Sequence, residues 1–345
     1  MLPPKNFVNQ DPWLKPYASA IESRLKYISS RTRQLLDNKS IDEFALGHLY
    51  YGLHKTESGW IFREWAPNAT KVYLVGDFNG WQDNESFRLK SRPGGIFELE
   101  ITHEKIVHQQ KYKLHIYWPG GDGYRMPSYT TRAVQDPETH NFDAQVWQPT
   151  SDYRWRHKSP PATSQPPVIY EAHIGMSGQD PEVASYRHFT KNILPRIQTA
   201  GYNTVQLMAV QEHPYYGSYG YHVSNLFAAS SRYGTPEELK TLIDTAHSLG
   251  LRVILDIVHS HAIKNENEGL AKFDGTANQY FHAGERGQHI AWDSLCYDYG
   301  KPEVVHYLLS NCRYWLDEYR FDGFRFDGVT SMLYSHHGLA KAFTS

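Results

Sequence analysis

The sequence contains very little cysteine. Cys296 and Cys312 are the only two among 345 residues, which excludes the disulfide framework of a small secreted domain, and their spacing matches no common zinc motif. The first residues, MLPPKNFVNQDPW, lack the basic and apolar segments of a secretory signal peptide. We therefore expect a cytoplasmic protein from a reducing compartment.

Long apolar runs and a strong net charge are also missing. No stretch approaches the roughly 20 apolar residues that span a bilayer, and the formal net charge is only −2. A dedicated nucleic-acid binder or a polybasic membrane surface needs a clear excess of positive charge. The composition predicts a soluble protein with neither nucleic acid nor membrane as a partner.

Aromatic residues, by contrast, are abundant. They make up 14% of the chain, with 25 tyrosines and 9 tryptophans. Aromatic rings fill protein cores, and their faces also suit the apolar faces of sugars. The length exceeds what one compact core usually serves, so the sequence predicts more than one domain.

The first 45 residues are expected to form a helical extension. Asp11 and Pro12 are typical of a helix start, with an N-cap followed by proline in the first turn. Apolar residues then recur at helical spacing, so a helix is predicted to end at about Leu36. We expect this segment to serve packing rather than chemistry.

Residues 46–150 have the period of two that is typical of strands. In Ile96–Ile101 and Lys111–Trp118, apolar residues alternate with polar ones. Turns such as Asn79-Gly80 and Gly94-Gly95 separate the short strands. The pattern predicts a β-sandwich.

A connector at residues 151–167, which includes the run SPPATSQPP, precedes a third region. In residues 168–345, buried strands alternate with amphipathic helices, which predicts a parallel sheet or barrel. The predicted strands are 168–174, 204–208, 252–257 and 323–327, and the first three helices cover 185–200, 235–246 and 304–316.

The segment Tyr319–Met332, YRFDGFRFDGVTSM, carries the chemistry most clearly. Arg325 and Asp327 share one face of the predicted strand, because alternate side chains of a strand point the same way. Asp322 lies at an odd spacing from Asp327, so it cannot point into the same pocket. A guanidinium beside Asp327 favours its ionised form, which a nucleophile requires. A purely structural Arg–Asp pair on a buried strand is an equally open interpretation of these few residues.

The longer motif GFRFDGVTSM resembles the fourth-strand motif of the α-amylase superfamily, in the form found in glycogen and starch branching enzymes. The resemblance implies that Asp327 is the nucleophile and that Arg325 keeps it ionised. The fold it implies is multidomain, with an N-terminal helix, a glycogen-binding type of β-sandwich, and the first half of a (β/α)8 TIM barrel.

Two further motifs fit the same family. DIVHSH, ending at His261, resembles the superfamily's first motif, which implies a hydrogen bond from His261 to the reacting sugar and a supporting role for Asp256. EHPYYGSYGY resembles the loop whose last tyrosine, here Tyr221, stacks on that sugar, and Tyr219 is a second candidate in it. Trp292 is expected to line the glucan groove.

Other residues have alternative interpretations. His289 and Asp293 are weaker candidates for the glucan groove. His259 and His261 could instead ligate a metal, but no third ligand stands at a fixed spacing. The family resemblance implies neither a metal nor an organic cofactor.

The run from Trp60 to Trp81, WIFREWAPNATKVYLVGDFNGW, resembles the glycogen-binding type of sandwich that precedes the barrel in branching and debranching enzymes. Its tryptophans could be stacking platforms for sugars, although we expect Trp65 and Trp81 to be core residues. The opening residues, DPWLKPY followed by IESRLKYI, resemble the N-terminal extension of eukaryotic-type branching enzymes.

Retaining glycosidic chemistry needs a second carboxyl group as acid and base. In the superfamily this glutamate follows strand five, and a further aspartate follows strand seven. Neither motif is present, and Glu212 and Glu285 match neither position. The resemblance therefore covers only the N-terminal half of a branching enzyme. We expect the chain alone to be inactive and aggregation-prone at its exposed strand edges, and glucan transfer by the purified chain would contradict the first expectation.

The favoured function is cleavage of an α-1,4-glucan and transfer of the chain to a 6-hydroxyl, which makes an α-1,6 branch. The implied partner is an α-glucan such as glycogen, amylose or amylopectin, and a monomer is expected for the full-length form. Two alternatives stay open at this point: an α-glucan hydrolase of the same superfamily, and a non-catalytic glucan-binding protein.

Overall fold

The structure is a computed structural model, and it describes residues 7–102, 105–161 and 165–339. The chain divides into two compact units, Met1–Leu46 and Gly47–Ser345. No helix within the described ranges is both long enough and apolar enough to cross a membrane.

The first unit is helical, as predicted. The Asp11 side chain accepts a hydrogen bond from the Trp13 amide at 2.9 Å and so caps the first turn. That turn is a 3-10 helix, and it contains Pro16, which has no N–H for an α-helical bond. The long helix ends at Leu36, where the sequence predicts its end. The helices of this unit are α1 (Phe7–Gln10), η1 (Pro12–Tyr17), α2 (Ala18–Leu36) and α3 (Ile41–Phe44).

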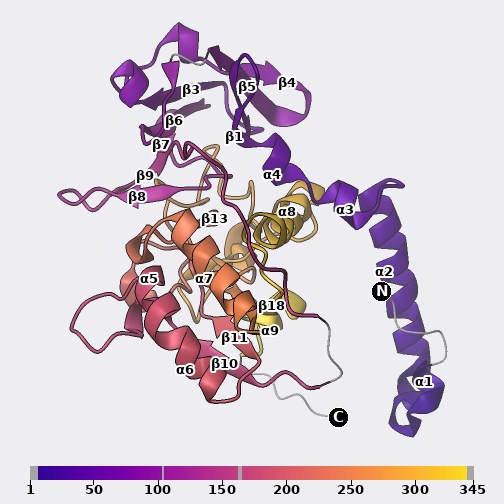
Figure 1. The fold of residues 1–345 in the computed structure, drawn as a ribbon. Helices are drawn as coiled ribbons and strands as arrows, with labels where there is room; N and C mark the ends of the chain where they lie inside the picture. The colour runs from indigo at the N-terminus through magenta and orange to yellow at the C-terminus, as the bar shows by residue number, and fades with distance from the viewer. Residues whose placement is uncertain (1–6, 103–104, 162–164, 340–345) are drawn as a thin grey trace. The chain divides into compact units, whose positions relative to one another are not determined.

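The second unit begins with two antiparallel sheets that form the predicted sandwich (Figure 1). One sheet has the order β1 (Gly52–Lys55), β2 (Gly59–Trp65), β5 (Ile96–Thr102) and β4 (Lys90–Arg92). The other has the order β3 (Lys71–Gly76), β6 (Lys111–Trp118), β9 (Phe142–Gln145) and β8 (Ala133–Gln135), with β7 (Gly121–Arg125) paired to β6.

The tryptophans of the sandwich differ in their surroundings. Trp60 is 6% exposed and belongs to the core. Trp65 is half-buried and packs edge-on against Tyr280, at 5.4 Å between ring centroids. The expectation that Trp81 is a core residue is wrong, because it lies on a turn with φ 61° and outside the core cluster. Its indole N–H instead donates to Asp77 on the surface.

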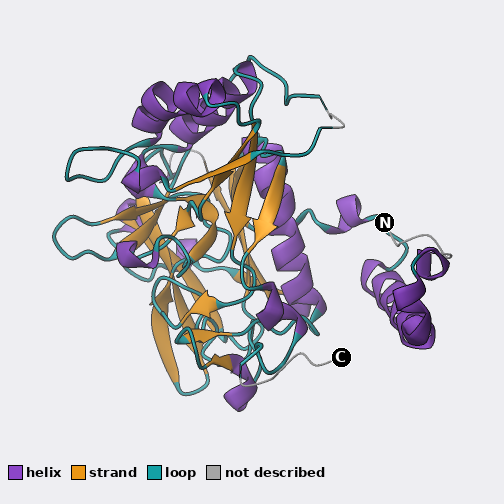
Figure 2. Cartoon of the chain, turned by 90° about the horizontal axis from the view of Figure 1, so that it is seen from below, coloured by secondary structure: helices purple, strands orange, loops and turns teal. Residues whose placement is uncertain are grey.

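The four strands that the sequence predicts in the third region form one parallel sheet (Figure 2). Its order is β10 (Ile169–Ala172), β11 (Thr204–Leu207), β14 (Arg252–Ile257) and β18 (Gly323–Phe326). Helices flank the sheet: α5 (Tyr186–His188), the π-helical η7 (Phe189–Ile193), α6 (Leu194–Thr199), α7 (Pro236–Ser248), α8 (Pro302–Tyr319) and α9 (Val329–Leu333). This is the first part of a β/α barrel, as predicted.

Two of the helices show how local sequence sets structure. The predicted helix at 185–200 contains a π-helical segment just before Pro195, whose ring nitrogen cannot donate the usual backbone bond. Helix α7 begins with a capping box, in which Thr235 and Glu238 satisfy each other's backbone amides.

Shorter elements complete the unit. The strands and α-helix are α4 (Gly47–Tyr50), β12 (Gln211–Glu212), β13 (Asn225–Ala229), β15 (Ala262–Ile263), β16 (Gln288–His289) and β17 (Ser294–Leu295). The 3-10 turns are η2 (Asp77–Asn79), η3 (Glu85–Phe87), η4 (Pro93–Gly95), η6 (Ile174–Met176), η8 (Tyr216–Ser218), η9 (Ser231–Tyr233) and η10 (Gly284–Gly287).

The sandwich and the half barrel are tied together by buried contacts. Asn68 contacts Asp274 through both its backbone amide and its side chain, each at 3.0 Å. The buried Glu64 of β2 accepts hydrogen bonds from the amide and hydroxyl of Ser128. Tyr307 of α8 in turn donates to the Ser128 carbonyl. These contacts make the sandwich and half barrel one compact unit.

The outer strands of the half barrel are exposed. Within the described ranges, β10 and β18 each pair with a single neighbour. All four residues of β11 are buried, whereas three of four in β10 are exposed and Phe326 of β18 is 38% exposed. The predicted open strand edges are therefore present, and aggregation through them stays a prediction.

Candidate active site

An arginine joins two carboxylates at the carboxyl end of the parallel sheet. Arg325 of β18 lies beside Asp256 of β14 in the strand register. Its Nη1 is 2.6 Å from Asp327 Oδ1 and 2.9 Å from Asp256 Oδ1. Phe324 and Phe326 point to the opposite face and contact each other, at 5.9 Å between ring centroids. The predicted alternation of this strand is confirmed.

Burial gives the two carboxylates different environments. Asp256 is fully buried, and this burial raises the pKa of its carboxyl, although hydrogen bonds from Arg325 and Tyr221 oppose the shift. Burial disfavours the charge of Arg325, but Asp256 and Asp327 outweigh it and raise the pKa of the guanidinium. The Asp327 side chain is 21% exposed. Asp327 is thus the carboxylate that a ligand can reach.

Tyr221 and His261 form the next part of the site. The Tyr221 hydroxyl donates to Asp256 Oδ2 at 2.9 Å. Nε2 of His261 lies 3.1 Å from the Tyr221 carbonyl and must donate to it, since a carbonyl only accepts. Burial lowers the pKa of His261 to about 4. His261 is therefore neutral near pH 7, with the Ser260 hydroxyl 3.0 Å from its Nδ1.

Trp292 provides an aromatic surface beside His261. The ring centroids of Trp292 and His261 are 4.9 Å apart. Trp292 also stacks on His289, with centroids 4.0 Å apart and the planes at 6°. His289 is held by the Ser331 hydroxyl, 2.8 Å from its Nε2. Trp292 is 38% exposed, so the structure brings it to the site with a face available for contact.

Several sequence candidates lie elsewhere. Tyr219 contacts His173 edge-on, at 5.8 Å between centroids, rather than the group around Asp327. Asp293 is exposed and pairs with Lys264. Asp322 accepts from the Val253 amide and contacts His247, away from Asp327, as its odd spacing predicts.

The alternative of a His-x-His metal site gains no support from the geometry. His259 Nε2 contacts the Asn311 side chain at 2.9 Å, whereas His261 faces Tyr221. Within the described ranges, no group of three or more potential metal ligands comes together. Glu212 is buried and accepts from Ser230 and the Ser231 amide, so its carboxylate has a structural role.

Sequence reasoning missed one residue that shapes the site. Gly328 follows Asp327 and has φ 63°. A Cβ there would lie 2.5 Å from Ser260 Oγ and 3.0 Å from the Trp292 ring. Only glycine fits this conformation and space without a shift. Its position directly after the Phe-Asp pair was the signal that could have indicated a tight turn.

Comparisons with protein-family models find two matches. Residues 50–137 match "Carbohydrate-binding module 48 (Isoamylase N-terminal domain)". Residues 191–289 match "Alpha amylase, catalytic domain". The two matches fall on the sandwich and on the half barrel.

Curated relatives match nearly the whole chain. A 1,4-alpha-glucan-branching enzyme of Yarrowia lipolytica is 46% identical over 97% of this chain and 50% of its own length. That of Felis catus is 46% identical over 97% of this chain and 49% of its own. A chloroplastic/amyloplastic 1,4-alpha-glucan-branching enzyme of Oryza sativa is 45% identical, covering 97% and 42%. The chain thus spans about half the length of the first two relatives.

Solved structures have the same fold. A putative alpha amylase from Salmonella typhimurium superposes with a TM-score of 0.67 at 25% identity, over 82% of this chain and 44% of that one. A pullulanase from Bacillus acidopullulyticus also has a TM-score of 0.67, at 20% identity, over 82% and 38%. The pullulanase likeness shows the fold alone.

Proposed function

We propose that this chain, a branching-enzyme homologue of the α-amylase superfamily, carries the nucleophile and the donor-binding part of a 1,4-α-glucan branching reaction. The observation that carries the proposal is the arrangement of Asp256, Arg325 and Asp327. One guanidinium contacts both carboxylates, and the more exposed carboxylate faces the site. The relatives over nearly the whole chain support α-glucan as the substrate class.

In the first step, Asp327 attacks the anomeric carbon of a glucose unit in an α-1,4-glucan. The bond to the O4 of the leaving chain breaks, and that oxygen takes a proton from a general acid. Retaining chemistry of this kind needs a second carboxyl group for that proton transfer. In the second step, the 6-hydroxyl of an acceptor glucan attacks the glucosyl–Asp327 ester and gives its proton to the base. The products are an α-1,6 branch and free Asp327.

The neighbouring residues have supporting roles in this proposal. Arg325 positions Asp327, because its Nη1 lies 2.6 Å from Asp327 Oδ1. His261 is neutral near pH 7, so it can bind a sugar hydroxyl without adding charge to the site. Tyr221 and Trp292 are proposed to pack against the sugar ring in the reacting position.

A donor with a fluoride leaving group tests the nucleophile directly, because fluoride leaves without help from a general acid. We would incubate the purified chain with a 5-fluoro-α-maltosyl fluoride and follow the intact mass. The expected result is one covalent glycosyl adduct per chain, on the peptide that contains Asp327. Asp327→Asn should give no adduct, while Asp322→Asn, a carboxylate outside the site, should react as the native chain does.

An adduct on another residue, or none at all, would contradict the assignment of Asp327. A second measurement distinguishes transfer from hydrolysis. It uses the full-length form of the protein with amylose as the substrate. New α-1,6 linkages that a debranching enzyme removes support branching. New reducing ends without such linkages would indicate hydrolysis instead.

A further inference from the structure

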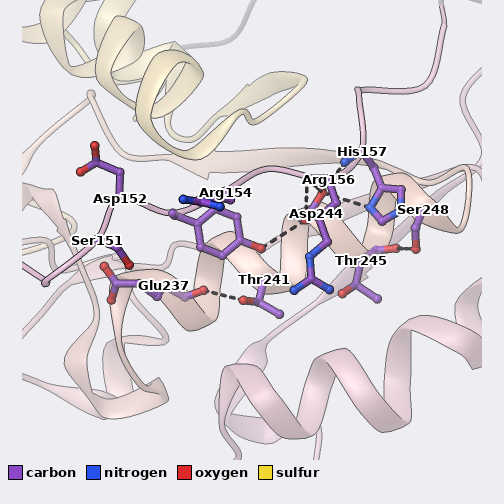
Figure 3. A pocket seen from close by; sticks show the side chains of 11 residues that line it. Ser151, Asp152, Arg154, Arg156, His157, Glu237, Thr241, Asp244, Thr245 and Ser248 are labelled. Carbon is purple, nitrogen blue, oxygen red and sulfur yellow. Dashed lines mark hydrogen bonds and ion pairs between the residues drawn. The ribbon is translucent and has the colours of Figure 1, made fainter.

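Two cavities lie along the connector, on the helix side of the half barrel. One has a volume of about 440 Å³ and lies between residues 151–157 and α7 (Figure 3). The other, of about 480 Å³, lies between the connector, β1 and helices α7 and α8. Asp152, Tyr153 and Glu237 line both cavities. We call the two together the connector groove. Both volumes are within the usual range for ligand sites, about 300–1,000 Å³.

The floor of the groove is fixed by one buried carboxylate. Asp244 of α7 is 4% exposed. It accepts hydrogen bonds from the backbone amides of Arg156 and His157, at 3.2 and 2.9 Å, and from the Tyr153 hydroxyl at 3.3 Å. Trp147 donates its indole N–H to Glu237 at 2.9 Å. The hydrogen bonds to Asp244 hold the connector against α7.

The two arginine side chains of the first cavity lack polar partners among the described residues. Neither the Arg154 nor the Arg156 guanidinium forms a hydrogen bond or ion pair with any residue in the ranges 7–102, 105–161 and 165–339. Figure 3 shows Arg156 among the hydroxyl-bearing side chains of α7, Thr241 and Thr245. Asp152 likewise forms no such contact within those ranges. Donors and acceptors are thus available together on one wall.

The charges of the groove balance. In the first cavity, Arg154 and Arg156 are offset by Asp152 and Glu237, and Asp244 accepts hydrogen bonds from the connector amides. In the second cavity, Lys240 pairs with Glu318, and Asp317 pairs with Arg313. A strongly anionic or cationic ligand would gain little from such a wall. A neutral ligand rich in hydroxyl groups fits better, because each hydroxyl both donates and accepts.

Aromatic rings extend along the same path. Tyr153 and Trp155 contact each other edge-on, at 5.0 Å between centroids. Trp155 is half-buried, with the Arg320 guanidinium 4.8 Å from its ring centroid. Trp147 lines the second cavity. Aromatic faces are suited to the C–H faces of sugar rings.

We propose that the connector groove binds a stretch of α-glucan, separate from the site at Asp327. The choice of ligand rests on the proposed function, which makes α-glucan the substrate class. The groove is lined by α7, and this helix contacts β14. Asp327, by contrast, directly follows the carboxyl end of β18. A glucan chain held there would be anchored to the protein while another part of the polymer reaches the reacting site.

The test uses the full chain and maltoheptaose as the probe, with binding measured by titration calorimetry. The double substitution Arg154→Ala, Arg156→Ala should weaken binding about fivefold or more, because it removes two charged hydrogen-bond donors. The matched control is Lys158→Ala, which removes a positive charge from the same segment but lines neither cavity. It should change affinity by less than about twofold.

A second readout locates the ligand. Backbone amides of residues 150–157 should exchange more slowly with deuterium when maltoheptaose is present, and this protection should vanish in the double variant. The proposal that the groove binds glucan would be overturned if the double variant bound maltoheptaose as tightly as Lys158→Ala and kept the same protection from deuterium exchange. A native chain that binds no maltoheptaose would overturn both proposals. If the native chain binds maltoheptaose in the groove but forms no adduct at Asp327, only the proposed reaction is contradicted.

Discussion

Tyr221 donates its hydroxyl hydrogen bond to the fully buried carboxylate of Asp256, at 2.9 Å. The tyrosine comes from a loop after β11 and the aspartate from β14, so this contact joins two segments that the sequence separates. Asp256 has only this hydroxyl and Arg325 as side-chain donors within the described ranges. The contact therefore matters for stability as well as for the site.

Tyr221→Phe should lower the free energy of unfolding by about 1–3 kcal/mol, because a buried acceptor loses its donor. Urea unfolding at pH 7 measures the change. Tyr219→Phe is the control, since Tyr219 is 45% exposed and its hydroxyl lies outside this contact. Equal stability of the two variants would contradict the role given to the Tyr221 hydroxyl.

Arg325→Met should be more damaging. It leaves the buried Asp256 without its positive partner, a change that typically costs about 3–5 kcal/mol at buried pairs. The Arg325 side chain is 42% exposed, so the lower end of that range is expected. The loss should shrink as pH falls, because burial raises the pKa of the Asp256 carboxyl and protonation removes its uncompensated charge. Urea unfolding at several pH values measures this, and a loss that does not vary with pH would argue against a charge effect.

Glu64 should make stability depend on pH. Burial raises the pKa of this carboxyl to about 7, although the Ser128 and Trp65 hydrogen bonds oppose the shift. The folded-state pKa lies above the unfolded value, so the folded protein binds the proton more tightly. Stability from this group is present in acid and is lost as pH rises from about 4.5 to 7.

The Glu64→Gln variant isolates that effect. Its stability relative to the native chain should rise by up to about 3 kcal/mol between pH 5 and pH 8, since a pKa difference of one unit corresponds to about 1.4 kcal/mol. Urea midpoints across this range give the comparison. Parallel pH profiles for the two proteins would show that Glu64 does not titrate as described.

Gly328→Ala should strain the turn that follows the proposed nucleophile. The added Cβ would meet Ser260 Oγ at 2.5 Å, and the left-handed backbone alone costs about 1–2 kcal/mol for a non-glycine residue. Gly250→Ala is the matched control, because its φ is 75° but nothing lies within 4 Å of the new Cβ. Thermal unfolding should show a larger loss for Gly328→Ala, and equal losses would exclude the steric contribution.

Local patterns in the sequence were enough to predict most of the fold. The alternation of Lys111–Trp118 gives β6 with the same bounds, and the capping box at Thr235 marks the start of α7. The shared face of Arg325 and Asp327 follows from strand geometry alone. These features depend on neighbours in the chain, so their signals are local.

Contacts between distant segments could not be predicted in the same way. The stacking of Trp292 on His289 depends on where a long loop folds back. Trp81 sits on a left-handed turn that brings its indole to Asp77 rather than into the core. The docking of the connector on Asp244 joins residues about ninety positions apart. None of these pairs follows from periodicity or capping, because tertiary packing determines them.

The exposed edge of β18 has a consequence for chemistry. Arg325 ties this strand to β14 on one side, so Asp327, the proposed nucleophile, is positioned by contacts already made. On the other side, no strand within the described ranges pairs with β18, so a further parallel strand could pair with its backbone groups there. A slip of one residue in that pairing would turn every side chain of the new strand to the opposite face. The two carboxyl groups of a retaining pair must lie about 5 Å apart. The hydrogen-bond register at this edge would therefore decide where a carboxyl group on the further strand lies. In one register it would face Asp327 across a glycosidic bond, and in the other it would point away from Asp327.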